Sequence, residues 1–177
     1  MKRKSIVLWL LAVVLTSCGG DKNSRLRYFN SMETDYSWQD NPPESIRRSK
    51  DAHSGDFLCK IDSVTPYSPT FNMKLWEISD KSLRSVHIKA WVKMSTLLSD
   101  PQIAVDIHDS TGKSIEWMSK KVKDFVSEPD RWVEASFNLE LDQKDRNRRS
   151  NTIRIYVSNG HPDVAFADDI EIKFKEM

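Results

Sequence analysis

The 177-residue chain is poor in glycine, in cysteine and in net charge. Its 5 glycines include neither a GxGxxG nor a GxxxxGK[ST] spacing, which excludes the common nucleotide-binding loops. Its 27 Lys and Arg residues are balanced by 26 Asp and Glu residues, whereas proteins that bind nucleic-acid phosphates normally present a concentrated basic face. We therefore expect no nucleic-acid partner and no nucleotide enzyme of the common kinds.

The chain does have enough apolar residues for one packed domain. Hydrophobic residues make up 38% of it and charged residues 30%, and it contains 6 Trp, 4 Tyr and 7 Phe. This composition excludes a disordered or a collagen-like chain. A single domain is the expectation for this length.

The N-terminus has the layout of a secretory signal. Three basic residues precede an apolar run from Ile6 to Leu15, which is short of the roughly 20 residues that a membrane-spanning helix needs. The run ends in Leu15-Thr16-Ser17-Cys18, which resembles the lipobox of bacterial lipoproteins. The alternative is an ordinary signal peptide that contains a cysteine by chance.

The lipoprotein resemblance implies a signal peptide over residues 1–17 and a lipidated tether over residues 18–27. In that family the new N-terminal cysteine, here Cys18, is diacylated, and two acyl chains are what stable anchoring requires. Gly19, not Asp, follows the cysteine, which under the sorting pattern of enteric lipoproteins implies the outer membrane. The resemblance thus implies a membrane partner through the lipid anchor.

Beyond residue 28 apolar and polar residues alternate at period two, which is typical of half-buried strands. The cleanest run covers residues 133–141. Similar runs cover 57–61, 86–92, 103–107 and 153–157. Turn signals separate these runs, and no segment has the pattern of a long amphipathic helix. The pattern predicts an all-β, antiparallel two-sheet jelly-roll β-sandwich, with Cys59 as a buried thiol.

Five short motifs occur in the order found in carbohydrate-binding modules. They are Phe29–Thr34 with Trp38, Ala52–Gly55, Ile88–Lys93, Asp130–Val133 and Phe166–Ile170. Together they resemble modules of families 4, 9 and 22, which have a galactose-binding-like jelly roll. The resemblance implies this fold for residues 28–177. Met32 replaces the usual Phe and residues 64–85 match no signature, so no particular ligand is implied.

The acidic residue Asp168 needs a partner. In a strand that alternates regularly, Asp168 falls on the same face as Phe166, Ile170 and Ile172, which predicts that its carboxylate points inward. A buried charge without a partner costs several kcal/mol. The related modules bind a structural Ca²⁺ at the sandwich edge. The resemblance implies the ligands Glu33 and Asp168, with backbone carbonyls at Ser31 and Asp51. The alternatives are a salt bridge from Asp168 to Arg47 or Arg48, and a hydrogen-bonded turn.

The residues form no recognisable catalytic constellation. The four histidines lie in no HExxH or HxH spacing, and no GxSxG nucleophile elbow is present. His108 beside Asp109 is compatible with a general base, but an ordinary surface pair is the alternative. We therefore expect a protein that is not an enzyme.

Sugar-binding sites combine aromatic rings with a few polar side chains. Two predicted strands present polar and aromatic residues on their outward sides. The resemblance to carbohydrate-binding modules implies that these two strands lie in one sheet, flanked by the strands that carry Trp117 and Trp76. The candidate glycan-binding residues are Trp76, Asp106, His108, Trp117, Arg154 and Tyr156. The alternative for Trp76 and Trp117 is that they plug the ends of the core. The competing function is a structural or protein-interaction subunit of a cell-envelope complex, with no glycan site.

Overall fold

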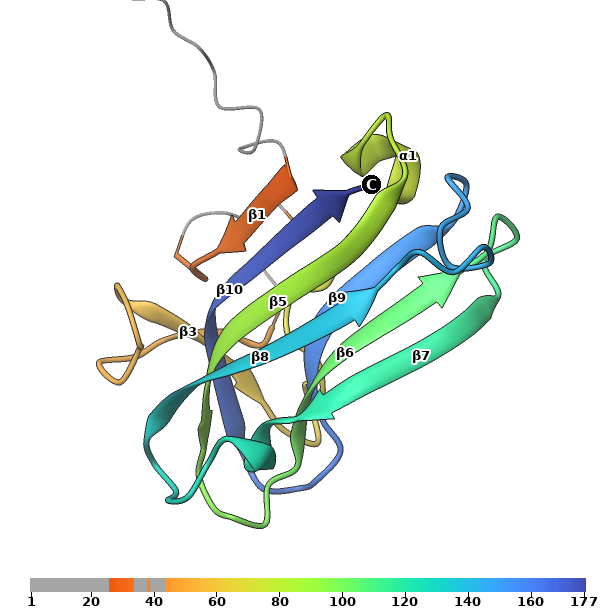
Figure 1. Ribbon diagram of the computed structural model, residues 1–177. Helices are drawn as coiled ribbons and strands as arrows, with labels where there is room; N and C mark the ends of the chain where they lie inside the picture. The colour runs from red at the N-terminus through yellow and green to blue at the C-terminus, as the bar shows by residue number, and fades with distance from the viewer. Residues whose placement is uncertain (1–25, 34–37, 39–43) are drawn as a thin grey trace, which may run out of the picture.

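The computed structural model describes residues 26–33, 38 and 44–177, and these form a β-sandwich (Figure 1). The predicted signal peptide and Cys18 lie outside the described residues. The strands are β1 (Arg27–Asn30), β2 (Ile46–Arg48), β3 (Phe57–Ile61), β4 (Phe71–Lys74), β5 (Leu83–Met94), β6 (Pro101–His108), β7 (Ser114–Lys121), β8 (Trp132–Glu140), β9 (Thr152–Asn159) and β10 (Ala165–Glu176). The prediction of an all-β, antiparallel two-sheet jelly roll is confirmed.

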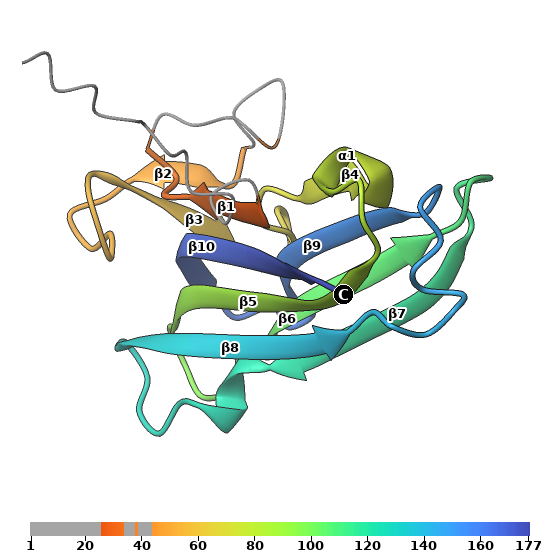
Figure 2. The same ribbon diagram turned by 45° about the horizontal axis from the view of Figure 1, so that its top comes forward.

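The strands form two sheets that face each other as two layers (Figures 1 and 2). Sheet A has the order β2-β3-β10-β5-β8, and β1 also pairs with β10. Sheet B has the order β4-β9-β6-β7. Every strand pair in both sheets is antiparallel.

The core lies between the sheets and is built from the predicted alternating residues. On β6 and β9 the residues that face the core are Ile103, Val105, Ile107, Ile153, Ile155 and Val157. The matching inner residues of β5 are Val86, Ile88, Ala90 and Val92. Cys59 on β3 is buried among them as predicted, and this burial raises the pKa of its thiol to about 12.

The predicted direction of Asp168 is wrong. Asp168 pairs with Trp91 of β5, whose neighbours Ala90 and Val92 belong to the core, so both Asp168 and Trp91 face outward from sheet A. A β-bulge between Asp168 and Glu171 shifts the alternation, and Asp169 within it has a φ of 45°. Asp168 is nevertheless 0% exposed, because a loop covers it.

Helices are few. The described residues contain α1 (Leu75–Ile78), which follows β4, and one turn of 3-10 helix (Val122–Asp124) between β7 and β8. None of the helices in this part of the chain has the length and apolar character needed to cross a membrane.

Candidate functional site

A row of four side chains crosses the outer face of sheet B. Asn72 of β4 pairs with Arg154 of β9, Arg154 with Asp106 of β6, and Asp106 with Trp117 of β7. The strand positions on either side of this row point into the core, so the row itself points outward. Four consecutive strands therefore contribute one residue each to a continuous polar and aromatic floor.

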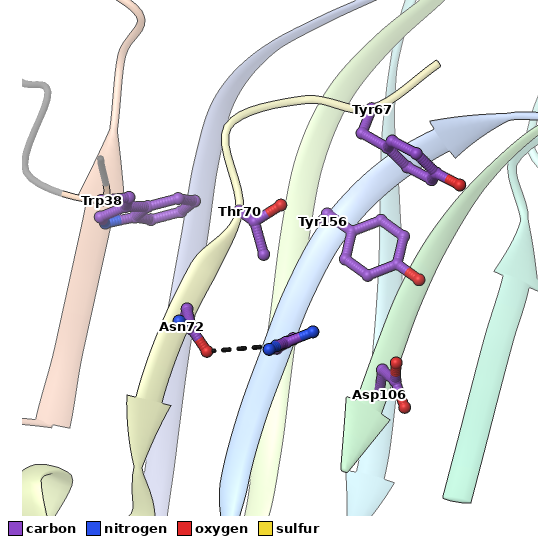
Figure 3. Close-up of a pocket in the computed structure, with 7 residues that line it drawn as sticks. Trp38, Tyr67, Thr70, Asn72, Asp106 and Tyr156 are labelled. Atoms are coloured by element: carbon purple, nitrogen blue, oxygen red, sulfur yellow. Dashed lines mark hydrogen bonds between the residues drawn. The ribbon is translucent and has the colours of Figure 1, made fainter. Parts of the chain in front are cut away.

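A hollow of about 410 Å³ lies over this floor, and we call it the sheet B cleft. Its lining residues are Trp38, Tyr67, Thr70, Asn72, Asp106, Arg154 and Tyr156. Figure 3 shows Trp38 on one side of the cleft and Tyr67, Tyr156 and Asp106 on the other. The dashed line there marks the 3.4 Å hydrogen bond from Arg154 Nε to Asn72 Oδ1.

The aromatic residues of the cleft hold one another in place. Trp117 Nε1 donates a 3.1 Å hydrogen bond to the Tyr156 hydroxyl. Tyr67 stands edge-on to Tyr156, with ring centroids 5.4 Å apart and an interplanar angle of 89°. Trp38 packs edge-on against the core residue Phe71 at 5.6 Å. A partly exposed ring whose orientation is fixed loses little entropy when it packs against a ligand.

The carboxylate of Asp106 is held by its neighbours in sheet B. His108 Nε2 lies 2.7 Å from Asp106 Oδ2, and the Ser114 hydroxyl donates to Asp106 Oδ1 at 2.6 Å. His108 Nδ1 contacts the carbonyl of Gly112 at 2.8 Å. The serine and the histidine therefore both bond to the aspartate and not to each other, so this group is not the nucleophile–base pair of a hydrolase.

The structure brings together most of the predicted glycan-binding residues. Asp106, Arg154 and Tyr156 line the sheet B cleft, and Trp117 contacts it through Tyr156. His108 is buried and positions Asp106. Trp117 is 51% exposed and Trp76 48% exposed, so neither plugs the core.

Trp76 lies apart from the cleft. It is on α1 and not on a strand of sheet B, and it lines a separate hollow of about 490 Å³ beside the β6–β7 turn. Lys74 Nζ lies 5.9 Å from the centre of its ring.

Sequence reasoning missed four residues of the cleft: Trp38, Tyr67, Thr70 and Asn72. The alternation of Phe71 and Met73 with Asn72 and Lys74 could have predicted that Asn72 lies on the outer face of a strand. Tyr67 has no such signal, because a single β-bridge to Ser158 places it over sheet B.

The outer face of sheet A is covered by the loop between β2 and β3, residues 49–56, which we call the 49–56 loop. Asp168 Oδ2 accepts hydrogen bonds from the amides of His53 at 2.9 Å and Ser54 at 3.3 Å. The His53 ring stacks on Trp91 with centroids 3.9 Å apart. Trp132 Nε1 donates to the carbonyl of Asp51 at 2.9 Å. Asp168 is therefore hydrogen-bonded to this loop, and burial raises the pKa of its carboxyl group to about 6.

Glu33 holds the other end of the same loop. Its Oε1 accepts hydrogen bonds from the amides of Asp56 at 2.9 Å and Phe57 at 2.8 Å. Its carboxylate also lies against Gly55, which has a φ of 61°. Two carboxylates distant in sequence thus converge on one loop of eight residues.

The calcium ion implied by the family resemblance stays a prediction. Glu33 and Asp168 fit it as hard oxygen ligands that converge on one loop, and bound Ca²⁺ would cross-link that loop to the sheet. The predicted carbonyl ligand of Asp51 accepts the hydrogen bond from Trp132 Nε1 at 2.9 Å, and Ser31 lines a neighbouring hollow. Among the described residues no three His, Cys, Asp or Glu side chains are grouped as metal ligands.

That neighbouring hollow, of about 400 Å³, lies on the outer face of sheet A. Charged side chains dominate it, and they pair with one another or with His53 beside the hollow. Lys89 bonds to Glu134 at 2.5 Å, His53 to Asp169 at 2.7 Å, and Arg27 forms an ion pair with Glu171. Its exposed aromatic residue is Phe29.

Comparison with solved structures places the fold among carbohydrate-binding modules. The C-terminal family 22 module of Clostridium thermocellum Xyn10B has a TM-score of 0.54 at 12% identity, covering 86% of this chain and 96% of that one. The second family 22 module of Paenibacillus barcinonensis Xyn10C, a xylan-binding domain, has a TM-score of 0.51 at 10% identity, covering 82% and 98%. At these identities the likeness shows the fold alone. No protein-family model matches the chain, and no curated protein matches its sequence.

Proposed function

We propose that this protein binds carbohydrate in the sheet B cleft and does not transform it. The observation that supports this most is a row of side chains across four strands of sheet B. Its members are Asn72, Arg154, Asp106 and Trp117, and the first three line the aromatic-walled hollow. Sugars present apolar C–H faces surrounded by hydroxyl groups. Tyr156 and Tyr67 offer ring surface for the former, and Asn72, Thr70 and Arg154 offer hydrogen bonds for the latter.

The structural neighbours support the same function. Modules with this fold from two bacteria are described as xylan-binding or as binding ligand in a cleft. The cleft here lies on an open face of a β-sandwich and is of ordinary size for a small-ligand site.

The test is titration calorimetry of the full chain in mild detergent against a panel of soluble plant and host polysaccharides. The proposal expects binding by the wild type and a loss of about fivefold or more for Tyr156→Ala, since ring contacts contribute about 1 kcal/mol or more beyond buried area. Phe29→Ala is the matched control, because Phe29 is an exposed aromatic residue on sheet A. Binding to no polysaccharide would favour the competing structural or protein-interaction function.

We also propose that Cys18 anchors this domain to the outer membrane. The support is the lipobox-like segment Leu15-Thr16-Ser17-Cys18 and the glycine that follows it. Labelled palmitate should be incorporated into the wild type but not into Cys18→Ala, which should also leave the membrane fraction. Retention of Cys18→Ala in the membrane would refute the anchor and leave the glycan proposal untouched.

A further inference from the structure

Arg154 occupies the middle of the cleft floor. It lies on β9, an inner strand of sheet B, and its side chain is exposed between those of Asn72 and Asp106. Tyr156 is two positions further along the same strand and on the same face, which places the two side chains roughly 7 Å apart along β9. A guanidinium group and an aromatic ring thus lie side by side in one cleft.

Within the described residues Arg154 forms no ion pair, and its one hydrogen bond is the 3.4 Å contact with Asn72. Most other described arginines pair with a carboxylate. The pairs are Arg27–Glu171, Arg48–Asp56, Arg131–Glu128, Arg146–Glu116, Arg148–Asp145 and Arg149–Asp80. In the described part of the chain Arg154 is therefore a cation without a carboxylate partner, and it lies at the centre of the proposed binding site.

The acidic residue opposite Arg154 in sheet B is hydrogen-bonded to other side chains. Asp106 is the residue directly opposite Arg154 on β6, where side chains normally interact. Both of its oxygens are instead occupied, Oδ2 by His108 and Oδ1 by Ser114. The remaining cleft residues are Trp38, Tyr67, Thr70, Asn72 and Tyr156, none of which carries a charge at neutral pH.

We infer that the ligand is an acidic glycan whose uronate carboxylate is bound by Arg154. Arginine presents a planar pair of N–H donors that matches a carboxylate, and such charge-assisted pairs are about twice as strong as neutral hydrogen bonds. The sugar ring that carries the carboxylate packs beside Tyr156. This inference rests on the proposed glycan-binding function and adds the charge of the ligand to it.

The test compares each acidic oligosaccharide with its own carboxyl-reduced form, which differs only at the charged group. The probes are a glucuronate-substituted xylo-oligosaccharide and an oligogalacturonide, titrated into the full chain in detergent. The wild type should bind at least one acidic probe about tenfold more tightly than its reduced form. In Arg154→Gln that ratio should fall to near one, while Arg154→Lys should keep part of it.

Arg131→Gln is the control for the change in net charge, because Arg131 is an exposed arginine outside the cleft. It should keep the wild-type ratio. Equal affinity for acidic and reduced probes in the wild type would overturn the inference while leaving the proposed function intact, as would an unchanged ratio in Arg154→Gln. Binding to neither form of any probe, nor to any polysaccharide of the panel, would overturn both proposals.

Discussion

The two outer faces of this sandwich carry similar residues but use them differently. On sheet A, Trp91 and Asp168 lie under the 49–56 loop, and the charged side chains beside them form ion pairs. On sheet B, Tyr156 and Arg154 line an open cleft, and Arg154 has no ion pair within the described part of the chain. Aromatic residues and charges by themselves therefore do not identify the binding face.

The comparison indicates that a face whose polar side chains are already hydrogen-bonded within the protein, as on sheet A, contributes to stability and not to binding. A buried carboxylate that accepts several amide hydrogen bonds contributes to stability, whereas an exposed cation without a partner is available to a ligand. Changes on sheet A should therefore lower stability without affecting binding, and changes on sheet B should do the reverse.

The largest expected effect is that of Asp168→Ala on stability. Removing this side chain leaves the partly buried amides of His53 and Ser54 without their acceptor, which should lower the free energy of unfolding by about 3 kcal/mol. Asp168→Asn keeps one acceptor oxygen and should cost less. Urea unfolding followed by tryptophan fluorescence measures both. An unfolding midpoint unchanged in Asp168→Ala would show that the 49–56 loop is not held through this residue.

Removal of calcium should have the next largest effect if Glu33 and Asp168 bind the ion. A ligand present at 100 times its Kd stabilises the folded state by about 2.7 kcal/mol, so a chelator should lower the Tm of the wild type. The same chelator should have no effect on Asp168→Ala. A wild-type melting curve that does not change with chelator, together with metal-free purified protein, would contradict the calcium prediction.

Gly55→Ala should lower the free energy of unfolding by about 1 kcal/mol more than the same change at a glycine with free space around it. Gly55 has a φ of 61°, and a Cβ there would lie 2.3 Å from Cδ of Glu33, so the Glu33 carboxylate would have to leave the loop amides that it binds. Gly112→Ala is the matched control, since Gly112 has a φ of 85° but no atom within 4 Å of the added Cβ. It should show only the backbone cost of about 1–2 kcal/mol. An equal loss of unfolding free energy in the two variants would show that Glu33 does not hold the 49–56 loop.

The smallest expected effect is that of Trp76→Ala on glycan affinity. Trp76 lines a hollow separate from the sheet B cleft, so its removal should change the Kd less than about twofold. Calorimetry beside Tyr156→Ala gives the comparison. A loss as large as that of Tyr156→Ala would extend the binding surface along sheet B to α1.

The sequence predicted the fold and the centre of the cleft because both follow from alternation. Period-two runs separate inward from outward residues, so Asp106 and Tyr156 could be assigned to an outer face before their strands were known to be neighbours. That assignment needs no knowledge of loops.

The same alternation failed at Asp168 because a β-bulge between Asp168 and Glu171 adds one residue to β10, so the inward position of Ile170 does not carry back to Asp168. Past the bulge every side chain changes face, and sequence spacing does not reveal the shift. Tyr67 and Trp38 were missed for a different reason. Their positions depend on contacts with Ser158 and Phe71, which are distant in sequence.

Chemical-shift mapping of the glycan complex tests the central claim most directly. The full chain in detergent is titrated with the glycan that calorimetry identifies, and backbone and side-chain resonances are followed by NMR. The account predicts that the perturbed signals cluster at Asn72, Arg154 and Tyr156 in the sheet B cleft, and that those of Phe29 and Trp91 on sheet A do not move. Perturbations centred on Phe29 and Trp91, with Tyr156 unaffected, would contradict it.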